Sequence, residues 1–406
     1  MTSDDDNLSL TDQRTQPAQG SVSEVFRVFL KLGLTSFGGP IAHLGYFRDE
    51  LVIRRKWLSE SAYADLVALC QFLPGPASSQ VGLALGLMRA GWGGAFAAFL
   101  GFTLPSALIL LALAMTAARL ESSLALGILH GLKIVAVAIV AQAVWGMARS
   151  LCPDRERAAI AVAAVVLLTF APGALGMMGA ILLGAIAGFG LGKGAATTGA
   201  HLPLPVSRRA GVAALALFAL LLAGLPVLAG LGQGFALADS FYRAGSLVFG
   251  GGHVVLPLLQ EETVTPGWVS EDVFLAGYGA AQAVPGPLFT FAAWLGTVMG
   301  PKPNGVAGAA IALLALFLPG FLILIAAVPF WDRFRRKAWA QSAMLGANAA
   351  VVGILGAALY SPVFTSAIGG IPDFALALTC FVALVAWKAP PWAVVLLVAA
   401  GGVVLG

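Results

Sequence analysis

Long apolar runs with almost no charge constrain this chain more than any other feature. A helix needs about 20 consecutive apolar residues to cross the hydrocarbon core of a bilayer. Four runs of this length contain at most one Asp, Glu, Lys or Arg: 94–118, 124–148, 210–231 and 305–331. Only 10% of the 406 residues are charged and 59% are apolar, whereas a soluble protein carries roughly 25% charged residues. The sequence therefore predicts an all-α polytopic membrane protein.

Composition also excludes several classes. The net charge of +4 comes from Lys and Arg gathered in a few loops, and no basic stripe is interleaved with aromatic residues, so nucleic acid is not an expected partner. Cys70, Cys152 and Cys380 are far apart, which supports neither a disulfide framework nor a metal site. Residues 1–21 are polar and acidic, lack the features of a signal peptide and are expected to form a disordered tail.

Two stretches of the chain resemble each other, which indicates an internal duplication. Residues 29–76 read FLKLGLTSFGGPIAHL, then RKWLSESAY, then CQFLPGP, and residues 241–287 read FYRAGSLVFGGGHVVL, then PGWVSEDVF, then AQAVPGP. Further on, FTLPSALIL at 102–110 matches LFLPGFLIL at 316–324. We therefore expect a first repeat at 22–192, a linker with one connecting transmembrane helix at 193–232, and a second repeat at 233–406.

The charges of equivalent loops predict that the repeats face opposite ways. The first repeat has Arg48, Arg54, Arg55 and Lys56 between its two motifs, whereas the matching loop of the second repeat carries Glu261 and Glu262. Basic loops mark the cytoplasmic side, so the loop at 48–56 is expected inside the cell. A single connecting helix inverts a repeat that itself crosses an even number of times. Inverted repeats are typical of secondary transporters.

The segments around the motifs are too short to span the bilayer. Pieces such as 22–37 and 76–90 would be about 20 to 24 Å long as helices. Pro-Gly-Pro stops a helix, and a break at membrane depth survives only where it is buried in protein or lines a wet cavity. Each repeat is thus expected to contain broken or re-entrant helices plus about four spanning helices. The charge pattern favours re-entrant hairpins over kinked crossings.

The breaks have the chemistry of an oxyanion site. A helix start leaves N–H groups without partners and carries roughly half a positive charge, and glycine lets an oxyanion approach the backbone. If the four breaks meet, donors converge from both repeats. The expected donors and breaks are Gly38, Gly39, Pro74, Gly75, Pro76, Ser78 and Ser79 in the first repeat, and Gly250, Gly251, Gly252, Pro285, Gly286, Pro287 and Thr290 in the second.

Other polar residues near the breaks allow two interpretations each. Lys31 aligns with Arg243, and a cation at this depth serves either an anion pathway or, by snorkelling, the interface. Gln71 and Gln282 precede each Pro-Gly-Pro by three residues and would donate an amide to the substrate or tie down the break. His43 and His253 flank the glycine breaks, where a histidine either moves a proton or has a structural role.

These motifs resemble the chromate ion transporter family in its long, two-domain form. The resemblance rests on Phe-Gly-Gly-Pro before a basic loop, on Gln-x-x-Pro-Gly-Pro and on Phe-Thr-Leu-Pro-Ser, each echoed in the second half. It implies export of chromate across the bacterial inner membrane and resistance to chromate, driven by the membrane gradient. Carried over by position, it implies functional roles for Lys31, Gly38, Gly39, Pro74, Gly75, Pro76, Arg243, Gly250, Gly251, Pro285, Gly286 and Pro287.

Three alternatives remain at this stage. Sulfate has the same charge and shape as chromate, so sulfate uptake would use the same site. A passive anion channel is a second alternative, since no ATP-binding motif marks a primary pump. An enzyme is not expected, and neither is a cofactor, because no catalytic constellation lies on the breaks. Outer apolar faces would equally meet lipid or a second copy in a homodimer.

Overall fold

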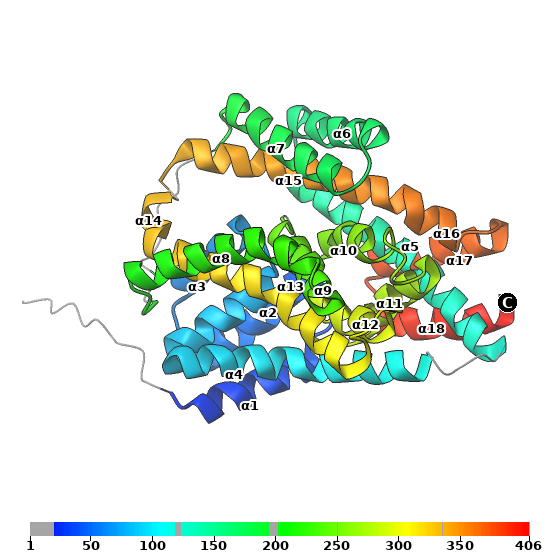
Figure 1. The fold of residues 1–406 in the computed structure, drawn as a ribbon, viewed down its shortest axis with the longest axis horizontal. Helices are drawn as coiled ribbons and strands as arrows, with labels where there is room; N and C mark the ends of the chain where they lie inside the picture. Colours follow the sequence, from blue (N-terminus) through cyan, green and yellow to red (C-terminus); the bar gives the residue numbers. More distant parts are fainter. Residues whose placement is uncertain are drawn as a thin grey trace, which may run out of the picture.

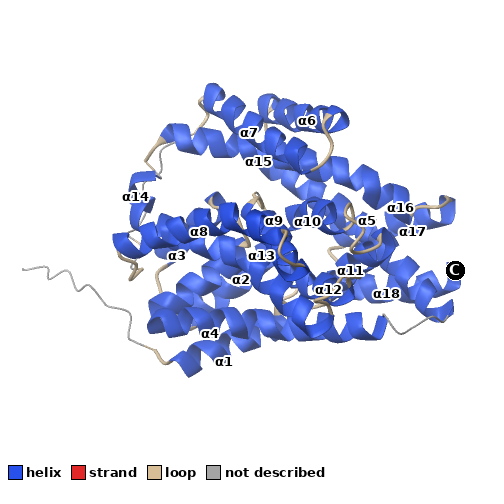
Figure 2. Ribbon diagram, viewed as in Figure 1, coloured by secondary structure: helices blue, strands red, loops and turns tan. Residues whose placement is uncertain are grey.

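The computed structural model describes residues 20–117, 123–194, 202, 204–249, 251–334 and 336–405. Within these ranges every regular element is a helix, which confirms the all-α prediction (Figure 2). The tail predicted to be disordered lies almost wholly outside the described residues. The first repeat contains α1 (Val22–Thr35), α2 (Gly39–Phe47), the π-helix η1 (Arg48–Arg54), α3 (Glu60–Phe72), α4 (Ala77–Ala117), α5 (Ser123–Leu151), α6 (Arg155–Phe170) and α7 (Ala174–Leu191).

A connecting helix and a second series of helices follow. The connecting helix is α8 (Arg208–Ala229). The second repeat contains α9 (Gln233–Ser246), η2 (Gly252–Val254), α10 (Val255–Thr263), α11 (Glu271–Ala283), η3 (Leu288–Thr290), α12 (Phe291–Val298), α13 (Gly305–Ala327), η4 (Val328–Phe330), α14 (Trp331–Phe334), α15 (Ala338–Ala358), η5 (Leu359–Phe364), α16 (Thr365–Ala367), α17 (Ile371–Val385) and α18 (Pro391–Leu405).

Six helical stretches of the described residues are long and apolar enough to cross a membrane, and they include all four predicted runs. They begin in α4, α5, α7, α8, α13 and α15. Only 6% of the apolar window of α8 is buried against the rest of the protein. The connecting helix therefore lies at the periphery, where its apolar side chains suit contact with lipid.

Helix α4 is two helices joined by a sharp turn. Ala90 and Gly91 have non-helical backbone angles, with φ of −144° and 61°. The chain folds back at this turn. The backbones of Gly86 and Gly94 are so close that a Cβ on Gly86 would collide with the carbonyl oxygen of Gly94. Residues 77–90 and 91–117 thus correspond to α12 and α13 of the second repeat, where Gly296 and Gly308 make the same close approach. Small residues at such crossings let two helices pack backbone to backbone.

The first break of each repeat forms a re-entrant hairpin rather than a kinked crossing. Phe29 of α1 and Phe47 of α2 lie on either side of the break, and their ring centroids are only 5.5 Å apart. A continuous helix would separate these two residues by about 27 Å. In the second repeat Arg243 of α9 and Glu262 of α10 are in direct contact across the corresponding break. The two arms of each hairpin therefore run antiparallel, and their outer ends lie on the same side of the protein.

The Pro-Gly-Pro breaks form hairpins as well. Trp57, just before α3, stacks under the guanidinium of Arg89 at the end of the first segment of α4, 5.2 Å from the ring centroid. In the second repeat the indole N–H of Trp294 donates to the carbonyl oxygen of Val273 at 3.1 Å, so α12 folds back along α11. Each repeat thus carries two re-entrant hairpins before its long helices.

The two repeats exchange helices. Helix α5 of the first repeat packs against α17 and α18 of the second, and α15 of the second packs against α6 and α7 of the first (Figure 1). Polar pairs join the repeats: His130 lies 3.0 Å from Asp373, and the Lys133 ammonium donates to Asp272 at 2.8 Å. These two residues of α5 therefore make helix–helix contacts. The reciprocal exchange follows from the duplication, because equivalent helices find equivalent partners.

Candidate substrate site

The breaks of the two repeats meet through a reciprocal pair of backbone hydrogen bonds. The Gly75 N–H donates to the carbonyl oxygen of Val248 at 2.7 Å, and the Gly286 N–H donates to that of Ser36 at 2.9 Å. Gly75 aligns with Gly286, and Ser36 aligns with Val248. Each Pro-Gly-Pro is thus bound to the residue that precedes the first break of the other repeat. This arrangement fixes all four breaks at one place between the repeats.

Glycine is required at these breaks by backbone geometry. Five of the predicted glycines have φ values in the left-handed region that side chains disfavour: 97° at Gly38, 79° at Gly39, 117° at Gly75, 142° at Gly251 and 107° at Gly286. Of the other two predicted glycines, Gly252 does not have a positive φ, and Gly250 lies outside the described residues. These five positions therefore disfavour a side chain, and the approach of an oxyanion to their backbone stays a prediction.

Close packing adds to this requirement. A Cβ on Gly75 would lie 2.8 Å from the Gly320 Cα, and one on Gly286 would lie 2.7 Å from the Ser106 Oγ. The side-chain amide of Gln80 donates to the carbonyl oxygens of Pro74 at 2.9 Å and Gly320 at 2.8 Å. Gln80 thus fastens the first Pro-Gly-Pro to α13 of the other repeat.

Two helix starts in the first repeat point their amide ends at this junction. Helix α2 begins at Gly39 after a left-handed Gly38 that supplies no side-chain cap. Helix α4 begins at Ala77 directly after Pro76, and the hydroxyls of Ser78 and Ser79 are 2% and 4% exposed. Gly38 is exposed and Gly39 is half-buried, so the start of α4 is the more enclosed of the two. A helix start leaves N–H groups available to a ligand.

Buried polar atoms without partners gather around these two helix starts. His43 lies one turn into α2, is 1% exposed and approaches the Ser78 hydroxyl at 3.4 Å through Nδ1. Its Nε2, together with the hydroxyls of Ser36, Ser79 and Thr103, has no hydrogen-bond partner among the described residues. Buried polar groups in native proteins are nearly always hydrogen-bonded. Four such atoms in one neighbourhood indicate a place where a polar ligand or water binds.

The second repeat is apolar at most of the equivalent positions, although Ser79 aligns with Thr290. His43 aligns with Val255, Ser78 with Phe289 and Gln80 with Phe291. Thr103 aligns with Phe317, whose ring lies 5.4 Å from that of Phe289. The unpartnered hydroxyls and imidazole nitrogen thus belong to the first repeat, and the second repeat contributes an aromatic wall. The sequence analysis did not single out Ser36, Gln80 or Thr103, whose signal is this contrast between the two copies.

Of the remaining polar candidates of the second repeat, His253 and Thr290 have partners within that repeat, whereas the Nε2 of Gln282 has none among the described residues. His253 Nδ1 lies 2.7 Å from the Tyr278 hydroxyl, and Gln282 lies next to the same hydroxyl. The Thr290 hydroxyl donates to the carbonyl oxygen of Pro287 at 2.7 Å, so it holds the start of η3. Gly252 approaches Pro40 of the first repeat, 3.1 Å from a Cβ built on the glycine. Gln71, by contrast, is exposed on α3.

Lys31 and Arg243 are each bound by a glutamate at the same relative position. The Lys31 ammonium lies 3.4 Å from a carboxylate oxygen of Glu50, and Arg243 donates twice to Glu262, at 2.9 and 2.8 Å. The partners are 19 residues apart in both repeats. The aligned cations therefore form equivalent ion pairs within their own hairpins. The Lys31 side chain is 54% exposed, away from the buried junction.

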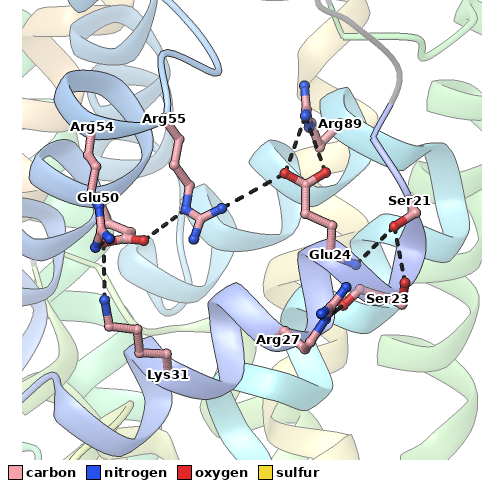
Figure 3. A network of polar contacts seen from close by, with 9 residues as sticks. All are labelled: Ser21, Ser23, Glu24, Arg27, Lys31, Glu50, Arg54, Arg55 and Arg89. Carbon is pink, nitrogen blue, oxygen red and sulfur yellow. Dashed lines mark hydrogen bonds and ion pairs between the residues drawn. The ribbon is translucent and has the colours of Figure 1, made fainter.

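The charges around these pairs differ between the repeats. Glu50 binds Lys31, Arg54 and Arg55, and Arg55 continues the network to Glu24, which also binds Arg89 (Figure 3). Burial raises the pKa of Glu50, but hydrogen bonds from Arg55 and Lys31 outweigh it and hold the pKa below its usual value. In the second repeat the carboxylates outnumber the cations, because Asp239 and Glu262 share Arg243.

The fold and the junction between the two repeats indicate the class of protein. Inverted repeats with broken helices that meet between the halves are typical of membrane transporters. The pattern of the chromate transporter family matches residues 23–189 and again residues 235–404, so the chain belongs to the chromate transporter family.

Similar proteins support this assignment. A chromate transport protein of Pseudomonas aeruginosa is 30% identical over 414 aligned residues, which cover 96% of this chain and 94% of that protein. A probable chromate transport protein of Synechococcus elongatus is 28% identical and covers 84% of each chain. A chromate transport protein of Cupriavidus metallidurans is 26% identical over 82% of this chain and 81% of that protein. No solved structure matches the chain significantly.

Proposed function

We propose that this protein is a secondary transporter that exports chromate from the cytoplasm across the bacterial inner membrane and so confers resistance to chromate. The observation that carries the proposal is the set of buried side-chain atoms without partners, the Nε2 of His43 and the hydroxyls of Ser36 and Ser79, beside the two helix starts of the first repeat. Hydroxyls, an imidazole and backbone N–H groups are the donors that a tetrahedral oxyanion accepts from. The relatives named for chromate transport supply the choice of oxyanion.

The proposed site lies where the four breaks meet. Its donors are the N–H groups of residues 77–79, the hydroxyls of Ser78 and Ser79, and the N–H groups at the start of α2. Gly38, Gly39, Gly75, Gly251, Gly252 and Gly286, with Pro74, Pro76, Pro285 and Pro287, shape the backbone around the anion. His253, Gln282 and Thr290 hold the second-repeat side of the site in place.

Export is the direction that the charges favour. The network around Glu50 has four cations, Lys31, Arg54, Arg55 and Arg89, for two carboxylates, and it adjoins the loop predicted to be cytoplasmic. Such an excess of positive charge raises the local concentration of anions at one mouth. A membrane potential that is negative inside then favours outward movement of each negative charge by about 2.3 kcal/mol per 100 mV.

Flux of labelled chromate into everted membrane vesicles tests the proposal. Accumulation should require an energised membrane, should fall when an uncoupler is added and should be reduced by excess sulfate. Vesicles that carry the variant Gly75→Val provide the matched control, because this substitution blocks the junction. Chromate flux that is unchanged by the uncoupler would indicate a passive channel. The absence of chromate flux would contradict the proposed function.

A further inference from the structure

A buried histidine stands beside the proposed anion site with one ring nitrogen unused. His43 is 1% exposed, and its Nδ1 faces the Ser78 hydroxyl at the start of α4. Phe102 contacts the ring edge-on, with centroids 5.3 Å apart, and the ring is hydrogen-bonded to the main chain of Ser36. The Nε2 atom has no hydrogen-bond partner in the described part of the chain. A purely structural histidine would use both nitrogens.

The charged groups around α2 have other partners. Glu50 and Arg54 of η1 bind each other, and the Tyr63 hydroxyl of α3 donates to the carbonyl oxygen of Leu44 at 2.6 Å. His253 of η2 faces Gly39 but binds Tyr278. The segments of α4 that contact His43 contribute Ser78 and Phe102, neither of which is ionisable at physiological pH. The other ionisable groups on α2 and on the elements around it are Tyr46, Arg48, Asp49, Glu50, Arg54, Glu60, Tyr63, Asp65, Cys70, Arg89 and His253.

Among the described residues, the cations nearest to the hairpins are already bound by carboxylates, so a dianion at the helix starts would meet mainly dipoles. Lys31 and Arg243 are bound by Glu50 and Glu262, and Arg89 contacts Glu24 and Trp57. Burying a divalent charge against dipoles alone is unfavourable, whereas an adjacent imidazole gains a proton readily when a negative charge approaches it. Histidine is the side chain best suited to this change near neutral pH.

We propose that His43 binds a proton when the oxyanion binds, and that its Nε2–H then contacts the anion, so that each dianion occupies the site together with one proton. This inference rests on the proposed function; it names the residue that takes up the proton, and it leaves one net negative charge per chromate for the membrane potential to drive outward. In the empty site the ring is neutral, with Nδ1 accepting from the Ser78 hydroxyl. With the anion bound, Nδ1–H donates to the Ser78 oxygen and Nε2–H donates to the anion.

Proton uptake during chromate binding tests the inference. The purified full-length protein is mixed with chromate in weakly buffered detergent solution at about pH 8, where chromate is a dianion, while an indicator reports free protons and labelled chromate reports binding. About one proton should be taken up for each bound anion, and the affinity for chromate should therefore fall about tenfold per unit of pH.

Two variants of His43 whose side chains do not titrate are compared with the unmodified protein. His43→Gln and His43→Asn should bind chromate more weakly, take up no proton and show an affinity that is flat with pH; the Asn amide can keep a hydrogen bond to Ser78. His130→Gln, which changes a histidine at the helix–helix contact with Asp373 outside the site, should retain the proton uptake. Chromate binding by the unmodified protein without proton uptake, or uptake that persists in both His43 variants, would overturn this inference alone. Failure of the unmodified protein to bind chromate would overturn the proposed function as well.

Discussion

Alanine at the central glycine of either Pro-Gly-Pro should destabilise the junction by a predictable amount. Gly75 has φ of 117° and Gly286 has φ of 107°, outside the region that alanine tolerates without strain. Such strain costs about 1–3 kcal/mol. A Cβ at Gly75 would also lie 2.8 Å from the Gly320 Cα, and overpacking of this kind costs about 1–3 kcal/mol more. We therefore expect Gly75→Ala to lose about 2–6 kcal/mol of stability.

The two repeats differ in how this loss can be relieved. The new Cβ at Gly286 would meet the Ser106 side chain, 2.7 Å from its Oγ, so Ser106→Gly should restore the steric part of the loss, about 1–3 kcal/mol. At Gly75 the neighbour is the backbone of Gly320, which already lacks a side chain, so no equivalent rescue exists. The strain from positive φ remains in both cases.

Thermal unfolding in detergent measures these effects, and chromate flux in vesicles reports function. Gly146→Ala is the matched control, because this glycine lies inside α5 and its Cβ would meet nothing within 4 Å. It should be neutral or slightly stabilising. A Gly75→Ala protein as stable and as active as the unmodified protein would refute the reasoning, as would the absence of any coupling between Gly286→Ala and Ser106→Gly.

Three further predictions concern the ion pairs and the orientation. Arg243→Gln leaves the buried carboxylates of Asp239 and Glu262 without their cation and should cost about 3–5 kcal/mol in thermal unfolding, of which Glu262→Gln in the same chain should restore part. Ion pairing holds the pKa of Glu50 in the folded protein below its usual value of 4.5. Ionised Glu50 therefore stabilises the folded protein fully above pH 4.5, and this stabilisation is lost as the pH falls through the lowered pKa. Unfolding temperatures measured from neutral to acidic pH should therefore decline less steeply for Glu50→Gln; equal slopes would contradict the assignment. A membrane-impermeant thiol reagent should label Arg54→Cys from the cytoplasmic side and Glu261→Cys from the outer side, in a background without the native cysteines, and labelling of both from one side would contradict the inverted repeats.

Much of the architecture can be predicted from the sequence, because the duplication places the same motifs in both halves of the chain. Pro-Gly-Pro at 74–76 and 285–287 predicts breaks, since proline and glycine act locally on the backbone. The choice between hairpin and kinked crossing depends on contacts such as Phe29 with Phe47, which lie beyond local rules. The charge pattern favoured hairpins, and the structure shows them.

Other features depend on tertiary contacts that no periodicity encodes. The partner of Lys31 is Glu50, 19 residues away across a hairpin, whereas helix spacing predicts only neighbours three or four residues apart. The exchange of α5 and α15 between the repeats is equally hidden, because an apolar helix face looks the same whether it meets lipid or protein. The donors Ser36 and Thr103 required the structure, since a lone Ser or Thr in an apolar run has no distinctive pattern.

The location of bound chromate tests the central claim most directly. A structure of the chromate-loaded protein, with the metal located by its anomalous scattering, would give the position of the anion independently of any mutation. The account predicts chromium where the breaks meet, within hydrogen-bonding reach of the Ser79 hydroxyl, the N–H groups at the start of α4 and the imidazole of His43. Chromium at the exposed Lys31–Glu50 network, with the junction between the repeats empty, would contradict it.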